Sequence, residues 1–278
     1  MSNPIQSFPW IHGAPDCAAS TDPPLQTFQF DANTFILRQS KCLDFEAPFL
    51  YLLFGSEKAL LLDTGAKSPP GKPVPVRDTV RALMEQWQHD HGHPALLLIV
   101  AHSHNHGDHV AGDAQFAGQP NTRLIRPALE EVKTFFRLPN WPDGSAELDL
   151  GGRILTILPL PGHEPSHIAM YDAKTRILLT ADTLYPGLLT VRDWPAYRRS
   201  AARLAQFTAA HPVSFVLGSH IEMKKTPRQM YPLGTTFQPD EHALPLFAQH
   251  VQAWHNACEA MGDHPHHDVH DELIIEPL

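Results

Sequence analysis

Cysteine, basic side chains and long apolar runs are all scarce in this 278-residue sequence. The three cysteines, Cys17, Cys42 and Cys258, are odd in number and widely spaced, which predicts reduced thiols rather than a disulfide framework. No apolar run approaches the roughly 20 residues that span a bilayer, and the N-terminus lacks a basic segment followed by an apolar one. We therefore expect a cytoplasmic protein with no membrane partner.

The scarcity of basic residues also limits the partners. Lysine and arginine number 21 against 30 aspartates and glutamates, giving a formal net charge of -9. Nucleic acids and anionic membranes are bound by clustered basic side chains, so neither is expected as the main partner. A small-molecule substrate fits the composition better. The length suits one large domain, which we place at residues 25–262, between an irregular arm (1–24) and a solvated His-rich, acidic tail (263–278).

Histidine is abundant, and four of the nineteen histidines lie within residues 100–112. The apolar segment 95–100 just before them is too short for a typical helix and rich in strand formers, which indicates a buried strand. The loop that follows has the spacing His-x-His-x-Asp-His, formed by His104, His106, Asp108 and His109. Imidazole nitrogens and a carboxylate at a tight turn are ligands that zinc prefers, so one short loop can serve two metal ions.

Three more candidate ligands follow apolar runs further along the chain. They are His163 in Pro161-Gly162-His163, Asp182 in Ala181-Asp182-Thr183, and His220 in Gly218-Ser219-His220. With these motifs in this order, residues 25 to 225 resemble the metallo-β-lactamase superfamily. The resemblance implies a first metal on His104, His106 and His163, a second on Asp108, His109 and His220, and Asp182 as the bridge. It also implies two zinc ions per chain, with iron or manganese as alternatives, and a four-layer αβ/βα sandwich with two mixed β-sheets.

Three residues outside the ligand set carry alternative interpretations. In the family, the Asp of Asp63-Thr64-Gly65 lies beneath the metals, where it can accept the second ring N–H of a ligand histidine; otherwise it is a turn residue. His167 either supports the ligands or is a satisfied buried histidine. Tyr185 lies at an offset from Asp182 similar to that in homoserine lactonases and can donate to a developing oxyanion, or it packs in its loop.

The remaining segments alternate strand and helix patterns, which is typical of α/β proteins. Strands are expected within 26–37 and 48–62, and covering helices at 76–87 and 194–210. A last helix is predicted from Pro239-Asp240, with an apolar stripe buried on the core or in a homodimer. The loops 137–144 and 221–238 are candidate substrate walls, although Trp141 can equally pack on the sheet.

The implied activity is metal-assisted hydrolysis. A hydroxide shared by two metals, with its pKa lowered toward about 7, attacks an ester, lactone or thioester carbonyl while Asp108 handles the leaving-group proton. The run Ala181 to Tyr185 is similar to the glyoxalase II branch, so hydroxyacylglutathione hydrolysis is an alternative. Weak β-lactamase or phosphodiesterase activity is another, but zinc β-lactamases carry Cys or Ser where this chain has Asp182. A non-enzymatic metal sensor or assembly module would tolerate Asp108→Ala; a hydrolase would not.

Overall fold

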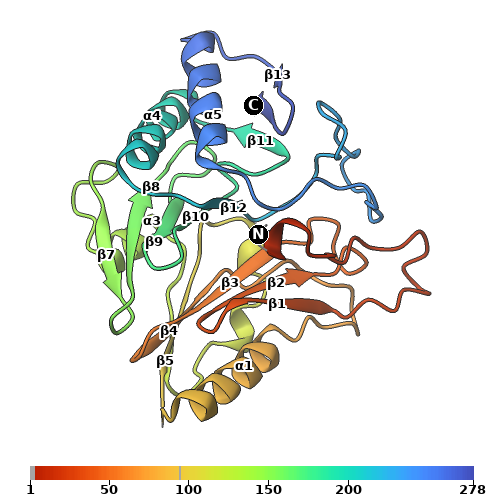
Figure 1. Ribbon diagram of the computed structural model, residues 1–278, viewed down its shortest axis with the longest axis vertical. Coiled ribbons are helices and arrows are strands. Elements are labelled where there is room, and N and C mark those ends of the chain that lie inside the picture. Colours follow the sequence, from red (N-terminus) through yellow and green to blue (C-terminus); the bar gives the residue numbers. More distant parts are fainter. Residues whose placement is uncertain (1–3, 94) are drawn as a thin grey trace.

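Two β-sheets stack face to face at the centre of the molecule, with helices on both outer sides (Figure 1). The computed structural model describes residues 4–93 and 95–278. The first sheet, in the order β1-β2-β3-β4-β5-β6, contains β1 (Leu25–Asp31), β2 (Thr34–Gln39), β3 (Phe49–Phe54), β4 (Lys58–Leu62), β5 (Leu97–Ala101) and β6 (Thr122–Leu124). The second, in the order β12-β10-β9-β8-β7, contains β7 (Ala146–Asp149), β8 (Ile154–Pro159), β9 (Ile168–Asp172), β10 (Ile177–Ala181) and β12 (Phe215–Gly218).

Helices complete the four layers. Val80 and Trp87 of α1 (Val76–His91) are buried with the outer face of the first sheet. Helices α4 (Trp194–Ala210) and α5 (Ala248–Met261) cover the outer face of the second sheet. Two short helices, α2 (Gly107–Val110) and α3 (Leu129–Phe136), lie in connections. The predicted four-layer sandwich is confirmed, and none of the helices in the described ranges is long and apolar enough to cross a membrane.

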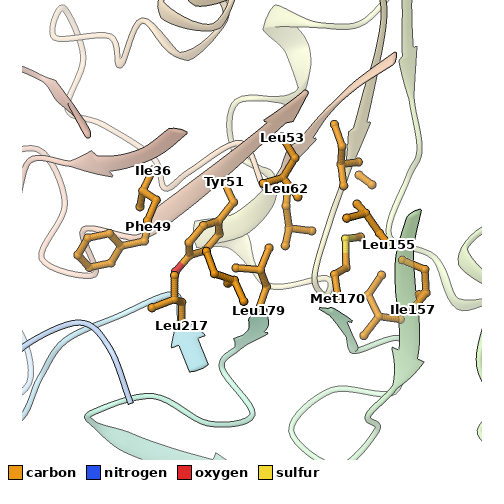
Figure 2. Close-up of a cluster of buried hydrophobic side chains, with 14 of the residues drawn as sticks. Ile36, Phe49, Tyr51, Leu53, Leu62, Leu155, Ile157, Met170, Leu179 and Leu217 are labelled. Atoms are coloured by element: carbon orange, nitrogen blue, oxygen red, sulfur yellow. The ribbon is translucent and has the colours of Figure 1, made fainter. Parts of the chain in front are cut away.

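The space between the two sheets is filled by apolar side chains from both (Figure 2). Ile36, Tyr51 and Leu62 from the first sheet meet Met170 and Leu179 from the second, all nearly free of solvent contact. Burying one such side chain contributes roughly 1.5–3 kcal/mol. This core fixes the two sheets relative to each other and therefore fixes the loops at their common edge.

A third sheet, which was not predicted, combines one strand from the middle of the chain with two strands of C-terminal residues. It joins β11 (Leu188–Val191), β14 (Ile274–Pro277) and β13 (Asp268–Val269), with β14 in the middle. Leu273, Ile274 and Ile275 are buried with α4 and α5, so the prediction of a solvated tail is wrong for this part of 263–278. The apolar run Leu-Ile-Ile supplies the reason, because it can be covered only by packing on the second sheet's helical layer.

The last helix begins at Ala248, later than the predicted start near Pro239-Asp240. Pro245 explains the difference, because it disfavours helical backbone at the preceding residue and lacks an N–H for the helix ladder. Leu246 instead forms an isolated antiparallel bridge to Val216. Within α5 the predicted stripe is buried on the core beside α4, through Val251, Trp254, Cys258 and Met261. Of the two alternatives for this stripe, the structure therefore shows burial on the core of the same chain.

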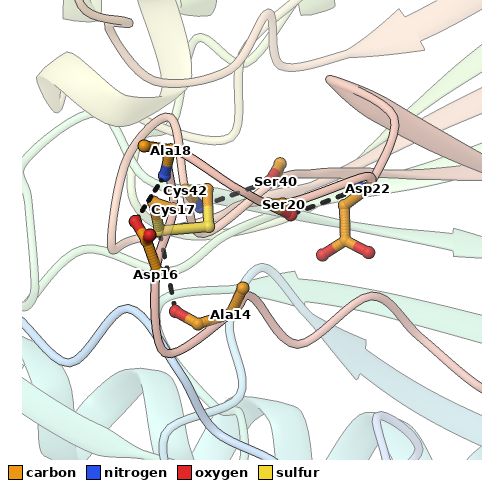
Figure 3. Close-up of a disulfide and its surroundings, with 8 residues drawn as sticks. All are labelled: Ala14, Asp16, Cys17, Ala18, Ser20, Asp22, Ser40 and Cys42. Atoms are coloured by element: carbon orange, nitrogen blue, oxygen red, sulfur yellow. Dashed lines mark hydrogen bonds between the residues drawn. A yellow bond between two sulfur atoms is a disulfide. The ribbon is translucent and has the colours of Figure 1, made fainter.

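From Pro4 onward, the described part of the N-terminal arm is irregular apart from a 3-10 turn at Pro4–Gln6 and an isolated bridge from Gly13 to Phe237, yet it packs against the first sheet. Ile5 and Trp10 are buried, and the Trp10 ring lies 4.9 Å from that of Phe49. Cys17 of the arm and Cys42 after β2 form a disulfide with a Cα–Cα separation of 5.0 Å (Figure 3). The prediction of reduced thiols is therefore wrong for this pair and right for the buried Cys258. The 25-residue spacing hides the pairing because the arm folds back onto the end of β2.

Candidate metal centre

The residues of the candidate site follow five strands, β4, β5, β8, β10 and β12, which end at one edge of the sandwich. In the first sheet, β4 and β5 run parallel, so Asp63 and the loop after β5 leave from the same end. In the second sheet, β10 is parallel to β12 and antiparallel to β9, which is antiparallel to β8. The carboxyl ends of β8, β10 and β12 therefore share one edge, where His163, Asp182 and His220 follow. Strand direction alone brings these distant residues together.

The first donor group consists of His104, His106, His163 and Asp182, whose ligand atoms all lie within 4.8 Å of one another. His106 Nδ1 is 3.0 Å from His104 Nε2 and 2.9 Å from His163 Nε2. Asp182 Oδ2 is 3.6 Å from both of those Nε2 atoms. Three imidazoles and one carboxylate thus surround one point.

The second donor group consists of Asp108, His109, Asp182 and His220, again within 4.8 Å. Asp108 Oδ2 is 3.0 Å from His109 Nε2 and 3.2 Å from His220 Nε2. Asp182 approaches the same two nitrogens at 3.4 Å through Oδ2 and at 3.3 Å through Oδ1. Asp182 belongs to both groups, so its two oxygens can serve two neighbouring cations.

These side chains fit metal ions by a criterion that is independent of family. Three of the atoms that face the donor groups are buried and make no hydrogen bond with any described residue: His109 Nε2, His220 Nε2 and Asp182 Oδ1. Such atoms are costly in a protein interior unless something compensates them. Two sets of histidine nitrogens and carboxylate oxygens at this spacing suit divalent transition-metal ions.

Hydrogen bonds from outside the donor groups aim the ligand rings inward. His109 Nδ1 donates to Asp63 Oδ2 at 2.9 Å, and His163 Nδ1 donates to the Thr190 carbonyl at 2.8 Å. His220 Nδ1 donates to the Glu46 carbonyl at 2.9 Å. Because each Nδ1 donates its proton outward, each Nε2 faces the site and can bind a metal once it has lost its own proton. Asp63 thus holds the His109 ring from outside the donor groups.

Burial and mutual contact shift the pKa values of these groups in opposite directions. Burial lowers the pKa of the His104 ring well below its usual value, and the nearby His109 lowers it further. Burial raises the pKa of Asp182, but His220, His109 and His104 outweigh it and hold that pKa well below the usual range. For His109 and His220, burial lowers the pKa, but the neighbouring carboxylates outweigh burial and hold each pKa well above its usual value. The centre thus holds ionised carboxylates that need positive charge.

Two residues named from the sequence lie beside the centre in different ways. The buried His167 ring stacks on His104 with centroids 4.9 Å apart, and its Nδ1 lies 3.2 Å from the Thr183 hydroxyl. The Tyr185 ring lies 5.5 Å from that of His220, and its hydroxyl is 2.7 Å from the Leu188 carbonyl and 3.1 Å from Glu222 Oε2. These contacts fit the packing alternative, and none of them joins the hydroxyl to a residue of the donor groups.

The two loops named as candidate walls also differ. Trp141 of loop 137–144 packs against the core between the sheets, as its alternative interpretation expected. Loop 221–238 instead contributes Glu222, Met230 and Leu233 to a small cavity, together with Phe45 and Leu188. This cavity has a volume of only about 10 Å³, and none of the residues of the two donor groups lines it.

The sequence analysis assigned no role to His102, the first of the four histidines within residues 100–112. Its ring is buried, with Nδ1 3.0 Å from the Ile125 carbonyl and Nε2 2.8 Å from Asp113 Oδ1. The Thr64 hydroxyl donates to the same carboxylate oxygen at 2.8 Å. These contacts hold the start of the His-rich loop against Ile125, which directly follows β6, and against the segment after β4. Its place in the His-rich segment was the only sequence signal for a role of His102, because Asp113 and Ile125, which it contacts, are not adjacent to it in the sequence.

The fold and the convergent donor groups define an αβ/βα sandwich protein with a candidate two-metal centre. The family model described as the metallo-beta-lactamase superfamily matches residues 43–220, more than half of the chain. The chain therefore belongs to the metallo-beta-lactamase superfamily.

Two sequence relatives carry the name hydroxyacylglutathione hydrolase. That of Ectopseudomonas mendocina is 32% identical over 109 residues, which is 36% of this chain and 38% of the relative. That of Synechococcus is 27% identical over 146 residues, half of each protein. The chain thus spans half or less of the length of these relatives.

Solved structures agree with the fold. The metallo-beta-lactamase DIM-1 has a TM-score of 0.50 at 15% identity, covering 84% of this chain and 98% of its own. TMB-1 has a TM-score of 0.51 at 14% identity, covering 86% of this chain and 100% of its own. At such identities the likeness concerns the fold and carries no information about the substrate.

Proposed function

We propose that this protein is a metal-dependent hydrolase that holds two zinc ions and cleaves an ester or lactone carbonyl. The observation that carries the proposal is the pair of donor groups sharing Asp182, with three of the buried polar atoms that face them unpaired. When bound, two such ions lower the pKa of a shared water and stabilise the charge that develops on the carbonyl oxygen.

The chain's own residues would then orient the ligand rings and transfer a proton to the leaving group. Asp63, Glu46 and Thr190 keep the ligand rings in place through their oxygen atoms. The Asp108 side chain is 18% exposed, so among the ligands it can exchange a proton with the leaving group or with solvent. His109 and His220 hold the pKa of that carboxyl below its usual range, against the effect of burial.

The surroundings of His220 favour an uncharged, apolar substrate. Glu46 and Glu222 lie close to His220, and Asp44 adds a third carboxyl group on this side. Phe45, Leu188 and Leu233 form a small apolar wall beside Glu222, and Leu233 is 72% exposed. An apolar acyl group suits this wall, whereas a substrate carboxylate would meet like charge.

A second candidate is hydroxyacylglutathione hydrolysis, which the names of the relatives favour. Because those matches cover half or less of each relative, the parts of the relatives outside the match are not accounted for in this chain. This leaves the glutathione substrate as the alternative rather than the main proposal.

The two candidates separate in one experiment on the zinc-loaded protein. We expect kcat/KM for a long-chain acyl homoserine lactone to exceed that for S-lactoylglutathione by at least about tenfold, the factor that 1.4 kcal/mol of transition-state binding provides. A ratio favouring the thioester would support the glyoxalase II alternative instead. If both are slow while an activated ester is cleaved, the centre is competent and the lactone assignment is wrong.

A further inference from the structure

The loop between β2 and β3, residues 40–47, touches the candidate metal centre through its backbone. The Glu46 carbonyl accepts the proton of His220 Nδ1 at 2.9 Å and so aims Nε2 of that ring at Asp108 and Asp182. A carbonyl in this position is as much a part of the ligand's support as a carboxylate. The placing of loop 40–47 therefore decides how one ligand of the second donor group is oriented.

The loop is held from inside by hydrogen bonds over very short spans. The Lys41 ammonium, in a nearly fully buried side chain, donates to the Phe45 carbonyl at 3.2 Å. The Asp44 carboxylate accepts the Glu46 N–H at 3.0 Å. Ala47, which follows Glu46, has φ +43°, a conformation that L-residues other than Asn and Asp rarely adopt. A strained backbone at this point persists only if its surroundings enforce it.

From outside, the loop is tied to the N-terminal arm by Cys17–Cys42 (Figure 3). On the arm, the Asp16 carboxylate accepts the Ala18 N–H at 2.9 Å, which forms a turn around Cys17. On the loop, Ser40 Oγ accepts the Cys42 N–H at 3.2 Å. The disulfide therefore joins two locally ordered turns and restricts how far loop 40–47 can move.

We propose that the Cys17–Cys42 disulfide is a positioning element for the second metal, acting through loop 40–47 and the Glu46 carbonyl on His220. This inference rests on the two-metal centre of the proposed function. It predicts that breaking the disulfide weakens retention of the second metal and leaves the first in place.

The selectivity follows from the contacts of the two donor groups. In the first group, His163 Nδ1 bonds to Thr190 of β11 and His104 Nδ1 lies 3.0 Å from Ser103 Oγ. Neither ring is hydrogen-bonded to loop 40–47, and within residues 4–93 and 95–278 only the second donor group receives such a bond, at His220.

The disulfide is accessible to a small reductant. A cavity of about 320 Å³ reaches both cysteines and is lined also by Ser20, Asp22 and Lys72. Tris(2-carboxyethyl)phosphine attacks one sulfur, and water completes the reaction, so that the S–S bond becomes two thiols and the phosphine becomes its oxide. The reagent supplies the two electrons, and water supplies the oxygen and the two protons.

The test starts from the zinc-loaded protein carrying two ions per chain. The protein is reduced with the phosphine and challenged with a chelator, while the zinc count per chain and the hydrogen exchange of amides 42–47 are followed. We expect one ion to leave at least about tenfold faster than before reduction, the lower end of the effect of losing a ligand-orienting contact, and the loop amides to exchange faster. Cys258→Ser, which removes the free buried thiol, should respond as the wild type does.

The double variant Cys17→Ser/Cys42→Ser gives a matched comparison. It should behave like the reduced wild type and should not change further on adding the phosphine. If that variant does not fold, reduction of the folded wild type still gives the answer. Unchanged zinc release and unchanged loop exchange after verified reduction would overturn the proposal.

The zinc count also separates this inference from the proposed function. A protein that binds two zinc ions and hydrolyses none of the substrates contradicts the proposed function alone, and the count after reduction still decides about the disulfide. An unreduced protein that cannot take up a second ion overturns both.

Discussion

At the scale of single residues, three of the seven non-glycine residues with positive φ in the described ranges lie beside the candidate metal centre. Ala47, Asp63 and Ala181 have φ values of +43°, +69° and +42°. Ala47 follows the carbonyl that orients His220, Asp63 holds His109, and Ala181 precedes the candidate ligand Asp182. Such conformations are retained where the fold over-determines them, often at functional sites. These three strained residues thus adjoin groups whose direction matters for metal binding.

Asp63 offers a direct test of the ligand support. Its carboxylate accepts from His109 Nδ1 and from the Ser103 N–H, the latter at 2.7 Å. Asp63→Asn replaces one acceptor oxygen by an NH2 donor, so we expect zinc affinity to fall about 10–100-fold, measured by competition with a chromogenic chelator. Asp90→Asn, at an exposed carboxylate of α1, serves as the control. Equal affinities of the two variants would contradict the supporting role of Asp63.

Lys41 predicts a pH dependence of stability. Burial and, less strongly, Arg38 lower its pKa, while Glu241, Glu222 and Glu46 raise it, and the net result is a pKa of about 8 instead of 10.5. Between about pH 8 and 10.5 the unfolded chain therefore binds more protons at this lysine than the folded protein does. The penalty for burying the charge is present below pH 8 and is relieved as pH rises, at up to roughly 1.4 kcal/mol per pH unit.

The comparison for this prediction is Lys41→Met, which has no charge to bury. Urea unfolding at pH 7.5 and 9.5 should show the wild type gaining stability relative to the variant as pH rises. A difference between the two proteins that is independent of pH would show that the folded protein leaves the lysine pKa at its ordinary value.

At the scale of elements, α5 is a core helix in this protein. The Trp254 side chain is nearly fully buried, and its Nε1 donates to the Tyr197 hydroxyl of α4 at 3.1 Å. Trp254→Ala should lower the free energy of unfolding by about 3–5 kcal/mol, because it leaves a cavity and removes the hydrogen bond that the Tyr197 hydroxyl accepts. Gln252→Ala on the exposed side should cost far less. Equal costs in chemical denaturation would argue against burial of this face.

Elements with a local signature could be predicted from the sequence, and those set by distant contacts could not. The apolar run before the His-rich loop and the helical spacing after Val76 required no tertiary information, and the structure has β5 and α1 there. The start of α5 was misplaced because the helical spacing of Leu244 and Phe247 concealed the effect of Pro245. The sheet of β11, β14 and β13 was missed because its strands are short and come from segments far apart.

The same division holds for the site. The candidate ligands could be identified because their chemistry lies in side chains at short, fixed spacings. The Glu46 carbonyl could not, because every residue carries a carbonyl and only the fold brings this one to His220. Pairing Cys17 with Cys42 required the arm to fold back onto β2, and the contacts of Tyr185 with Leu188 and Glu222 also come from the fold.

For the whole molecule, the central claim is that hydrolysis depends on two metals held at the edge between the sheets. The most direct measurement is a titration of the metal-free protein with zinc, following the cleavage of an activated ester. The account predicts that the rate rises until two zinc ions are bound per chain and that Asp108→Ala, at unchanged fold, loses turnover. Cleavage that does not depend on zinc, or that survives in Asp108→Ala, would contradict it.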